Sequence, residues 1–408
     1  MRILALTSWW PEPADNGIKL RIHYLLRALA RSHEIHLVTL THEDADTTRR
    51  QDIDQLCASA VALSAPQVNP RSRDIIASLW HTQPASVRIR WNPQFNALVN
   101  ERAATLKPDV VLAIELSTAV YAYAIPGVVR VLDDPELVGL SDWHQASSPT
   151  GKLRAWLTWY KQRSYVRRLL RFFDACSAVS EAELALVRRL APAHVLLALI
   201  PNGADMSEDI GKWGAPQPDT LIYPGSLTYS ANLDALQYLL RDIFPQIRHR
   251  RPGVRLRITG RAGPEHLAAL PSLEGVDVLG LVPDVRAEVA RAWCEVVPLR
   301  LGSGTRLKVL EALALGTPVV STPKGVEGLA LEHEHHVLVA DNPESFAAAT
   351  VRLLEHPELR VRLASEGRRR VAEMYDWRVI GERVNNLVIE VAERRRDVAP
   401  GLRRVRNA

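Results

Sequence analysis

Cysteine is scarce in this chain of 408 residues: it has three, Cys57, Cys176 and Cys294, far apart in the sequence. Three widely separated thiols form neither a disulfide framework nor a metal-binding motif, so we expect a reducing, cytoplasmic compartment. Long apolar runs are also missing, since no stretch approaches the roughly 18 apolar residues of a membrane-spanning helix. The first apolar residues are soon followed by acidic and turn-forming ones, which predicts a first strand and not a signal peptide.

Charge of either sign is moderate overall but unevenly distributed. Hydrophobic residues at 47% and charged residues at 24% are typical of a globular protein, and the net charge is only +5. Between Lys152 and Arg171, however, there are seven basic residues and no acidic one, interleaved with tryptophan and tyrosine. The last residues of the chain are also rich in arginine. The basic segment therefore needs an explanation of its own.

Strand and helix signals alternate along both halves of the chain. This alternation predicts an α/β fold with parallel, doubly wound sheets. Because the chain exceeds one ordinary domain, we expect two Rossmann-like domains that face a central cleft. The expected strands are 2–7, 35–40, 110–114, 128–132 and 175–179 in the first half, and 221–223, 254–259, 276–279, 295–298, 319–321 and 337–339 in the second.

A segment rich in proline, glycine and aspartate, 200–219, has no clear period and predicts the linker. We therefore expect an N-terminal domain over 1–200 and a C-terminal domain over 201–376. A helix over 377–396 is expected to pack back on the N-terminal domain, followed by a basic tail over 397–408. Ligands of such sheets bind at the carboxyl ends of the strands.

Residues 302–322 read GSGTRLKVLEALALGTPVVST, a glycine-rich turn followed by a helical pattern. With Thr305 as the N-cap, the helix would direct its free N–H groups at an anion in the turn. Lys308 and Glu311 are three residues apart and hence neighbours on one helix face. The cation suits a phosphate, and the carboxylate suits the hydroxyls of a ribose. An ordinary turn with an exposed Glu–Lys pair remains the alternative.

Beyond this turn, the stretch 294–329 closely resembles the nucleotide-binding signature of family 4 glycosyltransferases of the GT-B fold. The stretches YPGSLTYSANLDALQYLL (223–240), IPNGAD (200–205) and PEPADNGIKLRIHYLLRAL (11–29) extend the resemblance. It implies a GT-B fold in which 1–200 is the acceptor-binding domain and 201–376 is the nucleotide-sugar-binding domain. It also implies a transferase that moves a sugar, with retention, from a nucleotide-diphospho-sugar, with UDP- or GDP-sugars favoured. The acceptor would be a glycan or lipid-linked hydroxyl, as in cell-surface polysaccharide assembly. No metal or other cofactor is expected.

The resemblance also implies site residues. Glu311 matches the acid that binds the ribose, and the backbone of Gly304 and Thr305 matches the diphosphate cradle. Val282 would lie beside the base. Asn16 and Gly17 match the N-terminal turn that approaches the diphosphate and acceptor, with Arg21 one helical turn further on.

Two departures from the family pattern concern the donor. Ser303 stands where the family usually has an acid that holds the donor sugar. The usual Arg and Lys after the first strand of the C-terminal domain are missing, and Gly225 begins that loop. Because an unpaired, desolvated diphosphate is costly, other cations must contact it. Arg306, Lys308 and Arg261 are the candidates, and Lys308 is preferred because it shares a face with Glu311.

No catalytic triad or pair of acids at a telling spacing is present, so we expect catalysis by positioning and electrostatic stabilisation of the departing diphosphate. Lys308 and Arg306 would supply the positive charge. On the acceptor side, Asp133 or Asp134 could receive the proton or bind hydroxyls. The simpler interpretation of these acids is a turn before proline.

Four further interpretations remain open. The segment 152–173 could be a helix packed on the core, or it could also contact an anionic membrane as a peripheral anchor. EHEHH at 332–336 suggests a metal site, but contiguous ligands do not converge on one ion. A basic protein that binds nucleic acid lacks any supporting motif. A GT-B epimerase or phosphorylase, or a homologue without catalysis, is the alternative function.

Overall fold

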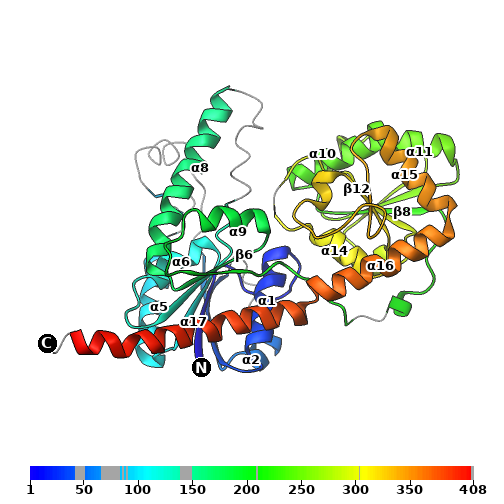
Figure 1. The fold of residues 1–408 in the computed structure, drawn as a ribbon. Coiled ribbons are helices and arrows are strands. Elements are labelled where there is room, and N and C mark those ends of the chain that lie inside the picture. The colour runs from blue at the N-terminus through cyan, green and yellow to red at the C-terminus, as the bar shows by residue number, and fades with distance from the viewer. Residues whose placement is uncertain are drawn as a thin grey trace. The chain divides into compact units, whose positions relative to one another are not determined.

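The computed structural model divides into two units, and each is described by itself (Figure 1). Unit 1 comprises Met1–Pro201 and Ile380–Ala408, and unit 2 comprises Asn202–Val379. The N-terminal domain was predicted to end at residue 200, and the first segment of unit 1 ends at 201. The helix that returns to this domain was predicted from 377, and the second segment of unit 1 begins at 380. The described residues are 1–41, 51–65, 83–84, 87–88, 91–137, 149–207, 210–302 and 304–405.

Unit 1 contains a parallel sheet of seven strands in the order β3-β2-β1-β4-β5-β6-β7. The central strands β1 and β4 are buried on both faces, which explains their largely apolar sequences. The two edge strands, β3 and β7, were not predicted, because their residues are only half-buried and do not form a clear apolar run. The strands are β1 (Arg2–Thr7), β2 (Glu34–Thr41), β3 (Ser59–Ser64), β4 (Val110–Ile114), β5 (Val129–Asp133), β6 (Ala175–Ala178) and β7 (Leu196–Leu199).

Helices flank this sheet, and the C-terminal helix is one of them (Figure 1). A Cβ atom on Gly381 would come within 2.6 Å of the Cβ of Ala28, so α17 and α1 approach too closely for a larger residue. Arg395 of α17 also forms an ion pair of 2.9 Å with Asp174. The helices are α1 (Gly17–Leu29), α2 (Gln51–Leu56), α5 (Pro93–Leu106), α6 (Leu116–Ala122), α8 (Pro149–Leu169), α9 (Glu181–Arg188) and α17 (Trp377–Val405).

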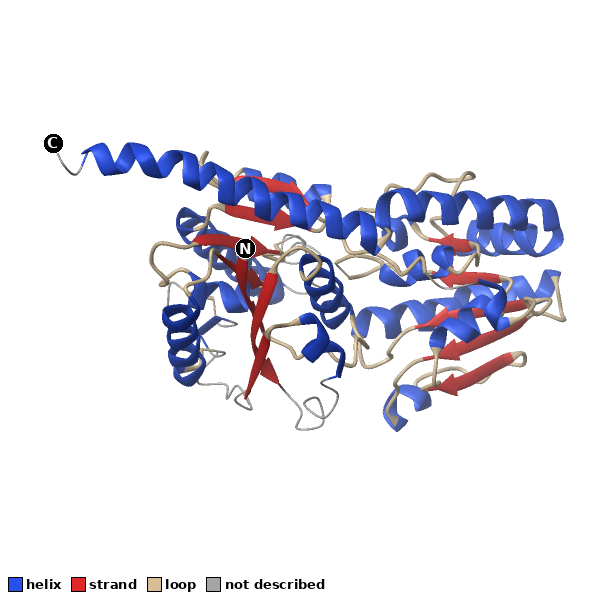
Figure 2. Cartoon of the chain, turned by 90° about the horizontal axis from the view of Figure 1, so that it is seen from below, coloured by secondary structure: helices blue, strands red, loops and turns tan. Residues whose placement is uncertain are grey.

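Unit 2 contains a second parallel sheet, of six strands in the order β10-β9-β8-β11-β12-β13. Figure 2 draws the strands of the chain as red arrows. Two parallel sheets of this kind confirm the predicted α/β fold class. The helix expected over 232–249 is interrupted by a π-helical turn, Leu239–Ile243. The strands are β8 (Thr220–Pro224), β9 (Arg255–Thr259), β10 (Val276–Gly280), β11 (Cys294–Val297), β12 (Val319–Ser321) and β13 (Leu338–Val339). The helices are α10 (Ser230–Tyr238), α11 (Phe244–Arg250), α12 (Pro264–Ala268), α13 (Val285–Ala290), α14 (Leu307–Ala314), α15 (Pro343–Glu355) and α16 (Pro357–Tyr375).

Two chain segments of unit 2, one near each of its ends, pair with one another. The backbone N–H of Ala204 donates to the carbonyl of Tyr375 at 2.8 Å, and that of Trp377 donates back to Ala204 at 3.3 Å. A Cβ atom on Gly203 would lie 2.6 Å from the Tyr375 carbonyl oxygen and 2.9 Å from the Trp377 ring. Only glycine therefore fits at position 203 without displacing its neighbours.

Candidate functional site

The glycine-rich turn follows β11 at the carboxyl edge of the unit 2 sheet, where ligands of parallel sheets bind. Gly302 and Gly304 have φ angles of 102° and 89°, in a region that strongly favours glycine. No Cβ is present at either position, so a ligand can approach the backbone closely. Ser303 lies outside the described residues, and its predicted role at the donor sugar stays a prediction.

The start of α14 differs from the prediction. The N-cap is Arg306, with no side-chain cap bond, and Thr305 lies outside the helix. The cause is the Arg306 side chain, which is 6% exposed and donates to the carbonyls of Gly302 at 2.8 Å and Lys324 at 3.1 Å. These bonds fix the backbone at Arg306, whose carbonyl then accepts from Val309. The Thr305 hydroxyl instead accepts a hydrogen bond of 3.0 Å from Asn202.

Lys308 extends from α14 to the loop after β8. Its ammonium donates to the carbonyl of Pro224 at 2.8 Å and to Asn232 Oδ1 at 3.1 Å. It also lies 4.8 Å from the centroid of the Tyr223 ring. A Cβ atom on Gly225 would be 3.0 Å from the ammonium nitrogen. Lys308 therefore places a positive charge in the loop from which the family's usual Arg and Lys are missing.

Burial and neighbouring charges act on this cation in opposite directions. Burial lowers the pKa of Lys308 to about 8, against the attraction of Glu295 and Glu311, which raises it. The Glu311 carboxyl is itself half-buried, and burial raises its pKa while Lys308 and Arg286 lower it. The predicted pair Lys308 and Glu311 is thus brought together on one face of α14. Its members interact electrostatically in a desolvated environment, where such interactions are strong.

The remaining donor-side candidates surround the same strand ends. The carbonyl of Arg261, in the loop after β9, accepts from the backbone of Leu227 at 2.8 Å, and Arg261 is exposed. Gly260 packs so closely on Gly225 that a Cβ would lie 2.2 Å from the Gly225 carbonyl oxygen. Val282 lies half-buried between β10 and α13. The loops after β8, β9 and β10 thus carry Gly225, Arg261 and Val282, respectively.

The acceptor-side candidates belong to unit 1. Asn16 is the N-cap of α1 and accepts a hydrogen bond of 3.1 Å from the backbone of Lys19, and Gly17 begins the helix. Arg21, one turn further on, points into the core and is 1% exposed. Asn16 and Gly17 thus shape the start of α1, whereas Arg21 presents almost no surface to a ligand.

Arg21 is bound by Asp133, the last residue of β5. The guanidinium donates to both carboxylate oxygens, at 2.7 and 2.6 Å, and Asp133 is also 1% exposed. The same guanidinium donates to the carbonyls of Ile200 and Pro201. This geometry gives both residues a structural role, because they tie α1 and β5 to the end of the unit 1 segment.

Asp134 follows directly and has a different environment. Its φ is 53°, and its carboxylate accepts from the backbone of Glu136 at 3.3 Å. Burial raises the pKa of Asp134 to about 7, with further increases from Asp133 and Glu183 and an opposing effect of Arg21. Asp134 retains some exposed surface. Of the two predicted acids, Asp133 and Asp134, it is the one with exposed surface.

Three residues near the donor turn were not predicted as site residues. Glu295 lies inside β11, and a single acid in the apolar string CEVV was the signal for it. Asn202 contacts Thr305 from 103 residues away, which no local pattern indicates. Tyr229 is half-exposed at the start of α10, and its hydroxyl lies 3.3 Å from where a Cβ of Gly302 would be.

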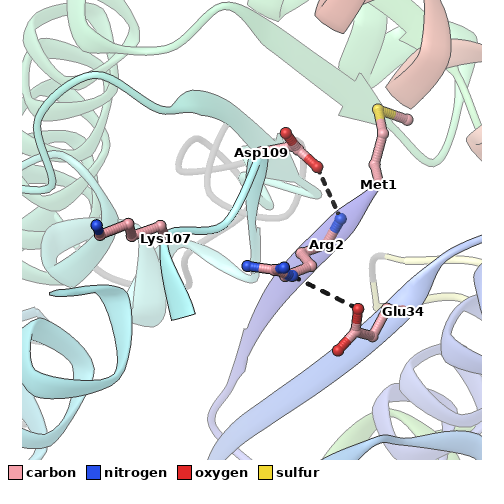
Figure 3. Close-up of a pocket in the computed structure, with 5 residues that line it drawn as sticks. All are labelled: Met1, Arg2, Glu34, Lys107 and Asp109. Carbon is pink, nitrogen blue, oxygen red and sulfur yellow. Dashed lines mark hydrogen bonds and ion pairs between the residues drawn. The ribbon is translucent and has the colours of Figure 1, made fainter. Parts of the chain in front are cut away.

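Two surface hollows lie away from this site. One, of about 410 Å³, is at the amino ends of β1 and β2, and Figure 3 shows Arg2 between Asp109 and Glu34 there. The backbone of Arg2 donates to Asp109 at 2.8 Å, and its guanidinium lies 3.5 Å from Glu34. The other, of about 590 Å³, is lined mainly by β9, β10 and α13 residues. The first hollow lies at the amino ends of its strands, whereas ligands of parallel sheets bind at the carboxyl ends.

The histidine-rich stretch 332–336 makes local backbone contacts. His336 and His333 accept hydrogen bonds from the backbone of Glu332 and Val339, at 3.0 and 2.9 Å. Among the described residues, no group of three or more His, Cys, Asp or Glu side chains is placed to hold a metal ion. The described helices also include none with the length and apolar character to cross a membrane.

The basic helix α8 has a buried half and an exposed half. Val166, Leu170 and Phe173, at and beyond its C-terminal end, are buried, as the core-packed interpretation predicted. Toward its N-terminus, Trp156 and Tyr160 are 40% and 55% exposed and stack with ring centroids 5.8 Å apart. Leu153 is 59% exposed beside them. We call the exposed half, with the arginines that follow it to 171, the α8 surface.

Two family models match the chain, one mainly over unit 1 and the other within unit 2. The family model "Glycosyltransferase Family 4" matches residues 15–208, and "Glycosyl transferases group 1" matches residues 218–356. A Xenopus tropicalis protein, glycosyltransferase 1 domain-containing protein 1, is 26% identical over 159 residues, which are 37% of this chain and 46% of that protein. The matching part thus spans less than half of that relative.

Two longer matches cover most of the chain. An uncharacterized 44.6 kDa protein in the cps region of Klebsiella pneumoniae is 21% identical over 367 residues, 85% of this chain and 89% of that protein. The crystal structure of Anabaena HepE in complex with UDP and glucose superposes with a TM-score of 0.66 at 16% identity, over 96% of this chain and all of that one. This likeness extends the shared fold to nearly the whole chain.

Proposed function

Because the chain belongs to the family 4 glycosyltransferases with the GT-B fold, we propose that it transfers a sugar from a nucleotide-diphospho-sugar to a hydroxyl, with retention. The observation that carries the proposal is the desolvated pair of Lys308 and Glu311 beside the glycine-rich turn. The pair offers a cation for the diphosphate and a carboxylate for the ribose. HepE, which shares the fold, was crystallised with UDP and glucose, and this favours UDP among the candidate nucleotides.

In the proposed complex the diphosphate lies over Gly304 and Thr305, with Gly225 on the other side and Lys308 between them. Glu311 accepts hydrogen bonds from the ribose hydroxyls. Val282 lies beside the base. Arg261, in the loop after β9, is an exposed cation that can contact the diphosphate. The donor sugar is then next to position 303 and to Tyr229.

The chemistry proposed is departure of a diphosphate whose growing charge is stabilised where it forms. Lys308 supplies a charge held by two hydrogen bonds, so little reorganisation is needed during the reaction. Arg306 contributes by fixing the turn through the carbonyls of Gly302 and Lys324. As the bond between the sugar's anomeric carbon and the diphosphate oxygen breaks, the acceptor hydroxyl attacks that carbon from the same face, which gives retention, and its proton passes to the departing diphosphate. We propose that no resident metal takes part.

On the acceptor side, we propose that the carboxylate of Asp134 accepts a hydrogen bond from the acceptor hydroxyl. Asp133 is bound by Arg21 and is 1% exposed, whereas Asp134 keeps exposed surface at the carboxyl end of β5. Asn16 and Gly17, at the start of α1, form the other part of the acceptor side.

The acceptor class follows from the α8 surface. Its exposed aromatic rings and its arginines, with no acidic residue from Lys152 to Arg171, suit an anionic membrane surface. A lipid-linked acceptor would be presented at such a surface. The Klebsiella relative in a cps region supports a role in polysaccharide assembly. We therefore propose a lipid-linked glycan as the acceptor and a peripheral membrane location, with no part for nucleic acid.

Calorimetric titration of UDP, GDP, ADP and dTDP tests the donor assignment. We expect one nucleotide to bind the wild type and Glu311→Gln to lose at least about 1.5 kcal/mol, the worth of a hydrogen bond to a charged group. Glu344→Gln, on the exposed first turn of α15, is the matched control and keeps full affinity. If no nucleotide binds, or if both variants bind equally well, the donor assignment is wrong.

Product stereochemistry tests the reaction type. With the donor identified, the anomeric proton of the product reports the configuration by NMR. Retention with transfer to an acceptor supports the proposal. An inverted product contradicts it, and release of an isomerised sugar without acceptor favours the epimerase alternative.

A further inference from the structure

Glu295, in the middle of β11, is a buried acid for which the proposed reaction has no role. Its side chain is 0% exposed, and among the described residues neither carboxyl oxygen has a hydrogen-bond partner. Its backbone is paired normally, since the N–H donates to the carbonyl of Pro318 at 2.9 Å. A buried carboxylate with no partner costs several kcal/mol, so an acid in this position keeps its proton unless a cation compensates it.

The ionisable groups around Glu295 come from three elements. Lys308 and Glu311 face it from α14, Tyr223 from β8, and Cys294 is its neighbour on β11. Arg286 of α13 acts on Glu311 in turn. Lys308 is the cation among these groups that acts directly on Glu295, but its ammonium donates to Pro224 and Asn232. Lys308 thus attracts Glu295 without bonding to it.

The balance of charge in this cluster sets what the site offers a diphosphate. With Glu295 and Glu311 both ionised, two carboxylates would face the one ammonium of Lys308, and the cluster would carry a net negative charge. With Glu295 protonated, Lys308 is opposed by Glu311 alone, and Glu311 is the acid that the ribose would engage. Burial accordingly raises the pKa of Glu295 well above its usual range, Glu311 adds to the increase, and Lys308 opposes it.

We propose that Glu295 is a positioning residue that carries a proton beside the donor site, so that Lys308 presents its charge to the diphosphate, and that loss of this proton weakens donor binding. This inference rests on the proposed function, because it assigns the diphosphate to Lys308. Glu295 touches no substrate in this arrangement. It acts through Lys308, and the cluster binds an anion with the proton in place.

The direction of the effect follows from proton linkage. If the complex holds more protons than the free protein, affinity falls as pH rises, by up to tenfold per pH unit for each linked proton. Glu295→Gln has the shape of the protonated acid and no proton to lose. The variant is therefore expected to bind as the wild type does at pH 7.5. Because Lys308 has a pKa of about 8, it loses its own proton in both proteins, and the affinity of both falls as pH rises. The wild type should lose affinity more steeply, by up to a further tenfold per pH unit, because Glu295 gives it a second proton to lose.

The experiment is calorimetric titration of UDP into the wild type, Glu295→Gln and Lys308→Met from pH 7.5 to 9.5. A terminal phosphate loses its second proton at about pH 6, below this range. The uracil ring of UDP loses its N3 proton toward the top of the range, but the same nucleotide is titrated into all three proteins, so this effect cancels when their profiles are compared. Lys308→Met should bind weakly at every pH. Identical pH profiles for the wild type and Glu295→Gln overturn the inference, because a purely structural Glu295 would shift stability and leave the profile unchanged. Loss of binding by folded Glu295→Gln at pH 7.5 also overturns it.

A second measurement needs no ligand and separates this inference from the donor assignment. The infrared band of a protonated carboxylic acid is recorded for the free wild type at pH 7.5, with Glu295→Gln as the reference. We expect a band in the wild type that the variant lacks. If no such band is lost, Glu295 is ionised and the inference fails, even where UDP binds. If the band is lost but neither UDP nor the other nucleotides bind, the donor assignment fails and Glu295 remains a protonated acid.

Discussion

Arg21 and Asp133 form a two-pronged ion pair of 2.7 and 2.6 Å in which both side chains are 1% exposed. The pair joins α1 to β5, which are 112 residues apart at these positions. Because the guanidinium also binds the carbonyls of Ile200 and Pro201, it holds three separate parts of unit 1 together. A fully desolvated pair of this kind is costly to break from one side.

Removal of one partner should therefore destabilise unit 1 strongly. For Asp133→Asn we expect a loss of about 3–5 kcal/mol in the free energy of unfolding, because Arg21 keeps a buried and uncompensated charge. Urea denaturation followed by circular dichroism measures the loss. The control is Arg255→Met, which breaks the exposed pair with Asp277 and should cost less than about 1 kcal/mol. Equal losses in the two variants would contradict the structural role of Asp133.

Asp134 should make stability depend on pH. Its pKa is raised to about 7 in the folded protein, whereas an unfolded aspartate ionises near about 3.9. Between these values the folded state binds more protons than the unfolded state, so the free energy of unfolding falls as pH rises from about 4 to about 7. Asp134→Asn removes this contribution, and asparagine tolerates the φ of 53°.

Urea denaturation at several pH values from 4.5 to 7.5 checks this expectation. The stability of Asp134→Asn relative to the wild type should increase with pH and level off above about pH 7. Glu12, whose pKa burial also raises to about 7, contributes equally to both proteins and cancels in the difference. A difference that stays constant across the range would show that Asp134 is ionised throughout.

Gly203 should be intolerant of even a methyl group. Gly203→Ala places a Cβ 2.6 Å from the Tyr375 carbonyl oxygen and 2.9 Å from the Trp377 ring, so the paired segments must separate. We expect a loss of about 1–3 kcal/mol, as for other overpacked sites. Gly253→Ala meets nothing within 4 Å and serves as the control, with little change expected. Thermal denaturation that ranks the two variants equally would refute the close packing at position 203.

Vesicle co-sedimentation tests the α8 surface. The wild type should bind vesicles that contain anionic phosphatidylglycerol and should not bind pure phosphatidylcholine. Glu substitution of exposed arginines 163, 167 and 168 should abolish binding, since each basic residue near such a surface contributes about 1 kcal/mol. The same reversal at exposed arginines 241, 250 and 255 of unit 2 changes net charge equally and should leave binding intact. Unchanged binding in the first variant removes the membrane role for these arginines.

The predictions from sequence succeeded where the determining pattern is local. Lys308 and Glu311 share a face because helix geometry fixes residues three apart, and the buried central strands are evident from their apolar runs. The N-cap was predicted at Thr305 and lies at Arg306, because a buried arginine that binds two distant carbonyls overrides the usual capping preference. The edge strands β3 and β7 are only half-buried, so their sequences carry no strong apolar pattern.

Contacts between distant parts of the sequence escaped prediction for another reason. Arg21 was assigned to the acceptor from its place one turn after Asn16, and only the fold shows that it faces Asp133. The bond from Asn202 to Thr305 likewise depends on how unit 2 folds. Glu295 was not predicted as a site residue, and its relation to Lys308 depends on the packing of α14 on β11.

Unit 1 is built from two separate segments of the chain and unit 2 from one, so the two units are completed at different times during synthesis. Unit 2 is one continuous segment, Asn202–Val379, and all its strands are available once that segment has been translated. Unit 1 has its sheet within the first 201 residues but buries Ile380, Val384 and Val388 of α17 in its core. The first half of the protein therefore waits, with an apolar face uncovered, until the last helix has left the ribosome. Truncation within α17 should yield a chain whose second unit is folded and whose first unit is prone to aggregate.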